Sequence, residues 1–234
     1  MSNLHASLAG VEVTFTTRKQ EVDEYINFVR GIYEKEVEAK YLTGPLAGQA
    51  AISRSLQKVL LANSFLLMYN IIEATVYNIM DSIYSHYISE GVEFDNLAPE
   101  IKLTMMKIYK VTASDESIKT CINLSKEVVV KAYEMLKEND FKLSGNIDAR
   151  KIRDISGDYN FSLMHDKELT RNGTGLLEIK TKRNKLAHGN ISFLDCGQDS
   201  SIDNVVKIWG EVKLFLEGVI DGVDDYLNHS KYLN

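Results

Sequence analysis

Apolar positions recur three or four residues apart along most of the chain, which is the period of an amphipathic helix. The segment 202–228 shows this most clearly, because apolar residues return at helical spacing throughout it: Ile202, Val205, Trp209, Val212, Leu216, Val219, Val223 and Leu227. A short run at residues 11–15, Val-Glu-Val-Thr-Phe, is β-prone instead. We therefore predict an all-α fold, in which residues 1–16 form an N-terminal arm or loop.

Breaks in this pattern separate the predicted helices. Helices are predicted over residues 17 to about 42, 51–89, 95–109, 114–139, 148–156, 176–188 and 202–228. Residues 43–45, Thr-Gly-Pro, end the first helix, and Pro99 suits the first turn of the third. Segments 160–175 and 195–201 are predicted loops. Because no internal repeat or low-complexity segment occurs, residues 1–234 are predicted to form a single domain.

The helix predicted over 51–89 is apolar on nearly all sides, which is typical of a central helix. Polar residues interrupt it in register: Asn63, Asn70 and Tyr77 are seven apart, and Glu73 lies on the same stripe. Buried polar groups need partners. Either these residues form an internal hydrogen-bond ladder, or Glu73 holds Arg183 and Asn70 lines the same site.

The stretch 176–190 reads as one helix with a marked end. Leu176, Ile179 and Leu186 recur at helical spacing, and Gly189 follows as a C-terminal cap residue should. Arg183 lies inside this apolar stripe, where a guanidinium is costly unless a carboxylate or an anionic ligand meets it. One interpretation is a structural ion pair, with His188 complementing the helix C-terminus. The other is a functional site in the last two turns.

The sequence Arg183-Asn184-Lys-Leu-Ala-His188 resembles the signature of the HEPN superfamily, in which an Arg and a polar residue precede a His by a few positions. Segment 61–77 resembles the early core helix of one bacterial HEPN branch, and segment 144–148 resembles a turn in that branch. The resemblance implies an up-and-down helical bundle with added short helices. It also implies a dimer with a composite active site at the interface.

The composition fits this class of protein. The 234 residues are 44% hydrophobic, which allows a sizeable core, and two Pro and 14 Gly suit long helices. Cys121 and Cys196 are too few for a disulfide framework, which indicates a reducing, cytoplasmic setting. We find no run of about 20 apolar residues in the sequence, so no membrane span is expected.

The net charge of −6 argues against a protein that coats nucleic acid along its whole surface. Residues 150–190 nevertheless hold nine Lys and Arg against five Asp and Glu, a local net charge of +4. This excess is either a restricted phosphate-binding patch, in which Lys180, Lys182 and Lys185 contact RNA, or a chance excess on a solvated surface.

The sequence offers little cofactor chemistry. The five histidines are His5, His86, His165, His188 and His229. None of them is paired with Cys, His or a carboxylate at the spacing of a zinc motif. No phosphate-binding loop or dinucleotide fingerprint is present. We therefore infer neither a metal nor a nucleotide cofactor.

Metal-free cleavage of RNA fits the remaining residues. The 2′-hydroxyl can attack its own 3′-phosphate if a base removes its proton, and an imidazole can do so near neutral pH. This predicts His188 as the acid–base, Arg183 as the group that neutralises phosphate charge, and Asn184 as an orienting residue. The products would be a 2′,3′-cyclic phosphate and a 5′-hydroxyl, and DNA should be spared.

Arg183 and His188 are five residues apart, roughly 140° around one helix, so they converge poorly within one chain. A two-fold axis that joins two such helices would gather two Arg and two His, and a two-fold homodimer is the commonest oligomer. HEPN proteins are commonly toxins or anti-phage effectors beside a neutralising antitoxin. In one branch the partner modifies a Tyr two residues after the signature His, where this chain has Asn190.

We therefore predict a metal-independent endoribonuclease of toxin or phage-defence type. The first alternative is a non-catalytic HEPN-like module that binds RNA or a protein. The second is a helical scaffold in which an Arg183–Glu73 pair is purely structural.

Overall fold

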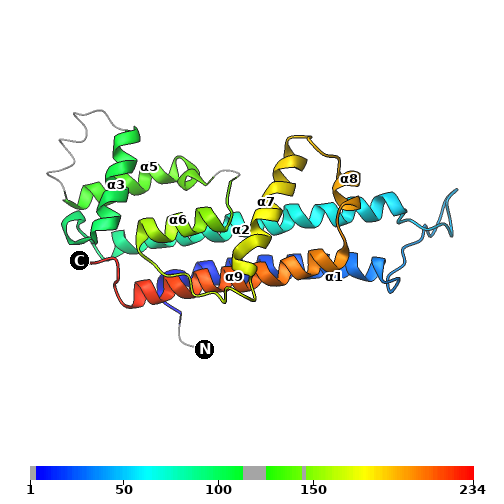
Figure 1. Ribbon diagram of the computed structural model, residues 1–234, viewed down its shortest axis with the longest axis horizontal. Coiled ribbons are helices and arrows are strands. Elements are labelled where there is room, and N and C mark those ends of the chain that lie inside the picture. Colours follow the sequence, from blue (N-terminus) through cyan, green and yellow to red (C-terminus); the bar gives the residue numbers. More distant parts are fainter. Residues whose placement is uncertain (1–3, 113–124, 144–145) are drawn as a thin grey trace.

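Three long helices, α1 (Ala9–Tyr33), α2 (Arg54–Ser89) and α9 (Ile202–Asn228), lie side by side and form the body of the protein (Figure 1). The computed structural model describes residues 4–112, 125–143 and 146–234. The shorter α-helices are α3 (Pro99–Thr112), α5 (Ser125–Lys137), α6 (Ala149–Tyr159), α7 (Thr174–Ala187) and α8 (Phe193–Gln198). The 3₁₀ turns are η1 (Ala6–Leu8), η2 (Phe94–Asn96), η3 (Asp140–Lys142) and η4 (Arg171–Gly173). The described part contains no strand, so the all-α prediction is confirmed.

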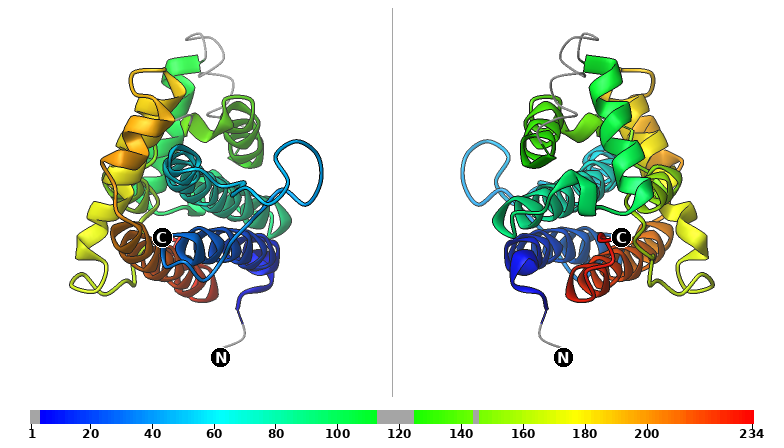
Figure 2. Two further views of the ribbon diagram at one scale, coloured as in Figure 1. Left: turned by 90° about the vertical axis from the view of Figure 1, so that its right-hand side faces the viewer. Right: turned by 90° about the vertical axis from the view of Figure 1, so that its left-hand side faces the viewer.

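α2 is the central helix, as its apolar composition predicted. It packs against α1, α7, α8 and α9, and seen end on the three long helices surround one core (Figure 2). By length and composition α2 could also cross a membrane, contrary to the expectation that no such apolar run exists; 56% of its most apolar window is buried inside the fold. The core helix of a helical bundle is buried to a similar extent. The absence of a membrane span stays an expectation.

The prediction of an N-terminal arm over residues 1–16 was wrong for the residues described. η1 and the start of α1 occupy this segment, and Leu8, Val11 and Phe15 are buried. These three residues are three and four apart, so they continue the apolar stripe of α1. Packing of that stripe against α2 overrides the β propensity of the local sequence.

The first helix also ends earlier than predicted, at Tyr33 instead of about 42. Lys35 adopts a left-handed conformation with φ of 62°, and the amide of Glu36 donates to the carbonyl of Gly31 at 2.8 Å. This arrangement closes the helix by satisfying its last carbonyl groups. Residues 34–53 form the connection to α2, with one isolated bridge between Lys40 and Ala50.

α3 and α5 stand at one end of the long helices, and α6 contacts α3 (Figure 1). The start of the helix predicted over 114–139 lies outside the described residues, whereas its remainder forms α5. Residues 144 and 145 of the predicted turn also lie outside them. Asp148 caps α6 by accepting from the amide of Lys151 at 2.9 Å, and α6 extends to Tyr159, beyond the predicted end.

α8 lies largely where a loop was predicted, over residues 195–201. Ser192 caps it, and its buried Gly197 lies against the backbone of α2, where a Cβ would come within 1.9 Å of the carbonyl oxygen of Lys58. A glycine is therefore required for this approach. The predicted loop over 160–175 likewise contains η4.

Tyrosines and one histidine fill the end of the core beside the C-terminus. The hydroxyl groups of Tyr84 and Tyr159 are 2.8 Å apart, and those of Tyr87 and Tyr226 are also hydrogen-bonded. His86 is buried, with Nε2 3.0 Å from the hydroxyl of Tyr232. Every polar tip in this group therefore has a partner, which allows its burial.

The burial of His86 makes stability depend on pH. Burial, and secondarily the neighbouring His5, lowers the pKa of His86 below the ordinary 6.5. Below pH 6.5 the unfolded chain therefore binds a proton that the folded chain resists, so the free energy of unfolding falls as the pH drops, by at most about 1.4 kcal/mol per pH unit. Thermal unfolding between pH 7.5 and 5 should show this decline. His86→Asn, which cannot titrate, should flatten it, and an unchanged slope in that variant would contradict the assignment.

Candidate functional site

α7 carries the Arg–Asn–His motif across the side of the bundle and ends in a projecting turn (Figure 1). Leu176, Ile179 and Leu186 are buried, as their spacing predicted. The helix ends at Ala187, and Gly189 follows with φ of 68°, a left-handed conformation that a glycine adopts without strain. Both the buried stripe and the end of this helix were therefore predicted correctly.

The Arg183 guanidinium stacks on the ring of Tyr69, a residue of α2, with 4.4 Å between the central carbon and the ring centroid. Its Nη1 donates to Oδ1 of Asn184 at 3.0 Å. The Tyr69 hydroxyl accepts from the amide of Ile147 at 3.1 Å, and burial raises the pKa of this tyrosine. Arg183 is half-buried on an aromatic face, where the cation is attracted to the ring. No motif or spacing in the sequence singles out Tyr69.

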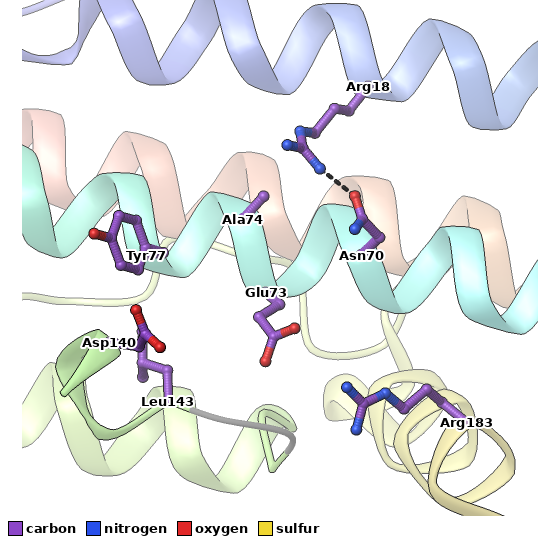
Figure 3. Close-up of a pocket in the computed structure, with 8 residues that line it drawn as sticks. All are labelled: Arg18, Asn70, Glu73, Ala74, Tyr77, Asp140, Leu143 and Arg183. Carbon is purple, nitrogen blue, oxygen red and sulfur yellow. Dashed lines mark hydrogen bonds between the residues drawn. The ribbon is translucent and has the colours of Figure 1, made fainter. Parts of the chain in front are cut away.

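Arg183 lies on the wall of a pocket of about 460 Å³ (Figure 3). The other lining residues come from α1, α2, η3 and the residue after η3: Arg18, Asn70, Glu73, Ala74, Tyr77, Asp140 and Leu143. The structure thus brings Asn70 and Glu73 together with Arg183, as the second interpretation of α2 proposed. Arg18 was not identified, because it lies on a different helix and belongs to no motif.

Glu73 and Arg183 reach toward the same space from α2 and α7 (Figure 3). The carboxylate of Glu73 can therefore serve as a counter-charge for the guanidinium inside this pocket. A direct ion pair between the two stays a prediction. Asn70 accepts a hydrogen bond from Arg18, which links α1 to the same wall.

His188 is not among the residues that line this pocket. It caps the C-terminus of α7, where its amide donates to the carbonyl of Asn184 at 3.0 Å, and its side chain is exposed. Among the described residues of one chain, Arg183 therefore faces a pocket while His188 faces solvent. This separation agrees with the poor convergence that the five-residue spacing predicted.

The three lysines predicted to contact RNA differ in availability. Lys180 pairs with Asp148; burial alone would raise the pKa of that carboxyl, but hydrogen bonds from Lys180 and the Lys151 amide lower it. Lys182 donates to Ser200 at 2.8 Å and lies over the ring of Phe65. Lys185 is exposed. Lys180 and Lys182 thus have structural roles, and Lys185 is the most accessible of the three.

A family model described as MAE_28990-like HEPN matches residues 8–232, which include both the motif helix and the pocket. No curated protein and no solved structure matches the chain significantly. In the described residues, no group of three His, Cys, Asp or Glu could hold a metal ion. The family match covers nearly the whole chain, and its helical fold agrees with the structure. The chain therefore belongs to the MAE_28990-like HEPN family within the HEPN superfamily.

Proposed function

We propose that the protein is a metal-independent endoribonuclease. The observation that carries this proposal is the intact motif in a HEPN chain: half-buried Arg183 on a pocket wall, Asn184 hydrogen-bonded to it, and exposed His188 at the end of the same helix. HEPN domains are often ribonucleases, and these three residue types meet the needs of cleavage by internal attack.

In the proposed reaction an imidazole of His188 takes the proton of the ribose 2′-hydroxyl. The 2′-oxygen forms a bond to phosphorus while the bond from phosphorus to the 5′-oxygen breaks. The leaving 5′-oxygen receives a proton from a second, protonated imidazole. Arg183 donates to the phosphate oxygens as charge develops on them, and Asn184 fixes the guanidinium. The products are a 2′,3′-cyclic phosphate and a 5′-hydroxyl.

A two-fold homodimer would complete this site. One concerted transfer needs both a base and an acid, one chain supplies a single motif, and its exposed His188 does not line the pocket of Arg183. A two-fold axis near residues 183–188 would bring His188 of the partner subunit toward the same cleft. Such self-complementary dimers are the commonest assemblies of soluble proteins.

We further propose that the enzyme acts in the cytoplasm as a toxin or phage-defence effector and that a neighbouring antitoxin protein restrains it. This assignment rests on what HEPN ribonucleases commonly do. Control by modification of a Tyr two residues after the His is not proposed, because Asn190 occupies that position.

Cleavage should persist in a chelator. Purified protein incubated with a defined RNA and excess EDTA is expected to give fragments with 2′,3′-cyclic ends, since no step uses a metal. An RNA with a single 2′-deoxy residue at the cut site should be spared there, because the nucleophile is missing. Loss of activity in EDTA, or cleavage at the deoxy position, would contradict the mechanism.

A non-catalytic module that binds RNA or a protein is the second candidate. One observation favours it: Arg183 and His188 do not share a pocket within one chain. Binding of RNA by a dimer that leaves the RNA intact would support this candidate over the ribonuclease.

A further inference from the structure

The motif explains only one of the two arginines at the pocket. Arg18 of α1 and Arg183 of α7 reach it from different sides, with Asn70 and Glu73 of α2 between them (Figure 3). Arg18 is half-buried and donates one N–H to Oδ1 of Asn70. It lies on an N-terminal helix, far in sequence from the Arg–Asn–His motif, so the proposed reaction assigns it no role.

Both guanidinium groups have donors to offer a ligand. A guanidinium carries five N–H donors in a planar fork. Arg18 gives one to Asn70, and Arg183 gives one to Asn184 while the face of its guanidinium group covers Tyr69. The remaining donors suit the oxygens of a phosphate, which Arg binds through charge-assisted hydrogen bonds.

The other lining residues favour a ligand larger and less uniformly negative than a simple anion. Glu73 and Asp140 bring two carboxylates to the same pocket, and these would repel a ligand that is only negative. A volume of about 460 Å³ also exceeds what one phosphate fills and lies within the range of small-molecule sites. A suitable ligand carries an anionic end for the arginines and hydrogen-bond donors for the acids. Tyr77 adds an aromatic surface for a planar ring.

We propose that this pocket holds one nucleotide of the RNA, with its phosphate between Arg18 and Arg183 and its base and ribose directed toward Glu73, Asp140 and Tyr77. The cleavage of that RNA rests on the proposed function, whereas the binding of the nucleotide does not. Arg18 is then a substrate-binding residue outside the HEPN motif, and it sets affinity for the strand.

Binding of a 2′-fluoro RNA tests this placement without cleavage, because the attacking hydroxyl is absent. Arg18→Gln should weaken binding by about tenfold or more. It should also reduce the slope of log affinity against log salt by about 0.7, the value for one lost contact to a single-stranded phosphate. Arg18→Lys should retain the slope. The matched control is Arg30→Gln on the same helix, since Arg30 is exposed and lies 3.9 Å from Glu34.

Competition identifies the ligand. Ribonucleoside monophosphates should displace the 2′-fluoro RNA from the wild-type protein, and inorganic phosphate at the same concentration should not. Equal displacement by phosphate would overturn the nucleotide assignment in favour of a simple anion site. Nucleotide binding that depends on Arg18, together with RNA binding that does not, would overturn the placement of the RNA strand here.

Kinetics with natural RNA separate the two proposals. If both hold, Arg18→Gln raises KM and lowers kcat/KM about tenfold or more, with an unchanged Tm, because Arg18 contacts the phosphate on which Arg183 acts. If the protein binds 2′-fluoro RNA through Arg18 but never cleaves RNA, the pocket stands and the ribonuclease proposal fails. If it cleaves RNA and Arg18→Gln matches Arg30→Gln in KM and salt slope, the pocket proposal fails. A lower Tm with an unchanged KM in Arg18→Gln would show that Arg18 only links α1 to α2 and does not bind the RNA.

Discussion

Replacing His188 with alanine should remove RNA cleavage and leave the fold intact. The imidazole is the group proposed to move the proton, and a positioned acid–base contributes about 10²–10⁴-fold to a rate. The side chain is exposed at the C-terminus of α7, so its loss removes no core contact. The cleavage rate of a defined RNA measures the first effect. The far-UV circular dichroism spectrum and the Tm measure the second.

The matched control is His229→Ala. His229 caps the C-terminus of α9 as His188 caps that of α7, and it is also exposed. Its contact with Asp225 is a surface interaction of small energy, so both cleavage and Tm should stay near wild type. Wild-type cleavage by His188→Ala would refute the assignment of His188 as the acid–base.

Mixed dimers extend this test to the composite site. Wild-type and His188→Ala subunits, coexpressed with different tags and purified through both, form dimers that retain both Arg183 side chains and a single His188. If cleavage needs an imidazole from each subunit, these dimers should have far less than half of the wild-type activity. About half of the wild-type activity in a dimer that forms normally would place the site within one chain.

The largest expected loss of stability comes from Arg171→Met. Arg171 forms a two-pronged pair with Glu211 of α9, in which its Nη2 lies 2.7 Å from Oε2, and this pair anchors the start of α7. The Glu211 side chain is only 6% exposed, so the substitution leaves a buried carboxylate without its partner. Removing one member of a buried pair costs about 3–5 kcal/mol, and the partly exposed Arg171 favours the lower value.

A loss of about 3 kcal/mol corresponds to a Tm lower by roughly 6–12 °C for a chain of this size. Lys19→Met is the control. Nζ of Lys19 lies 3.0 Å from Oε1 of Glu217, which belongs to α9 as Glu211 does, but the Glu217 side chain is 40% exposed. An exposed pair contributes at most about 1 kcal/mol. Urea unfolding of both variants measures the difference. Equal losses would show that burial of Glu211 does not control the effect.

Local pattern was sufficient for two of the three long helices. The continuous apolar surface of α2 predicted a central helix, and the period of α9 predicted its limits at Ile202 and Asn228. The sequence pattern gave a wrong prediction where two local signals conflicted. Residues 11–15 combine high β propensity with a helical stripe formed by Val11 and Phe15, and only the partner surface on α2 selects the helix.

In the candidate site, too, some features are visible in the sequence and others depend on how the helices pack. The motif Arg183-Asn184 to His188, its place at a helix end and the conflict of a charge inside an apolar stripe are all visible in the sequence. The stacking of Arg183 on Tyr69 is not, because it depends on which face of α2 meets α7. The role of Lys180 also changed, since Asp148 binds it from a segment that was expected only to start α6.

Features that depend on neighbours within a few turns could be predicted from the sequence: the helical class, most helix positions, the end of α7 just before Gly189 and the family motif. Which charges meet across helices depends instead on tertiary packing. Arg18 reaches the pocket of Arg183, and Arg171 pairs with the buried Glu211, from positions with no mutual spacing in the sequence. The physical reason is that helical periodicity fixes the direction of a side chain on its own helix, whereas its partner is set by how separate helices pack.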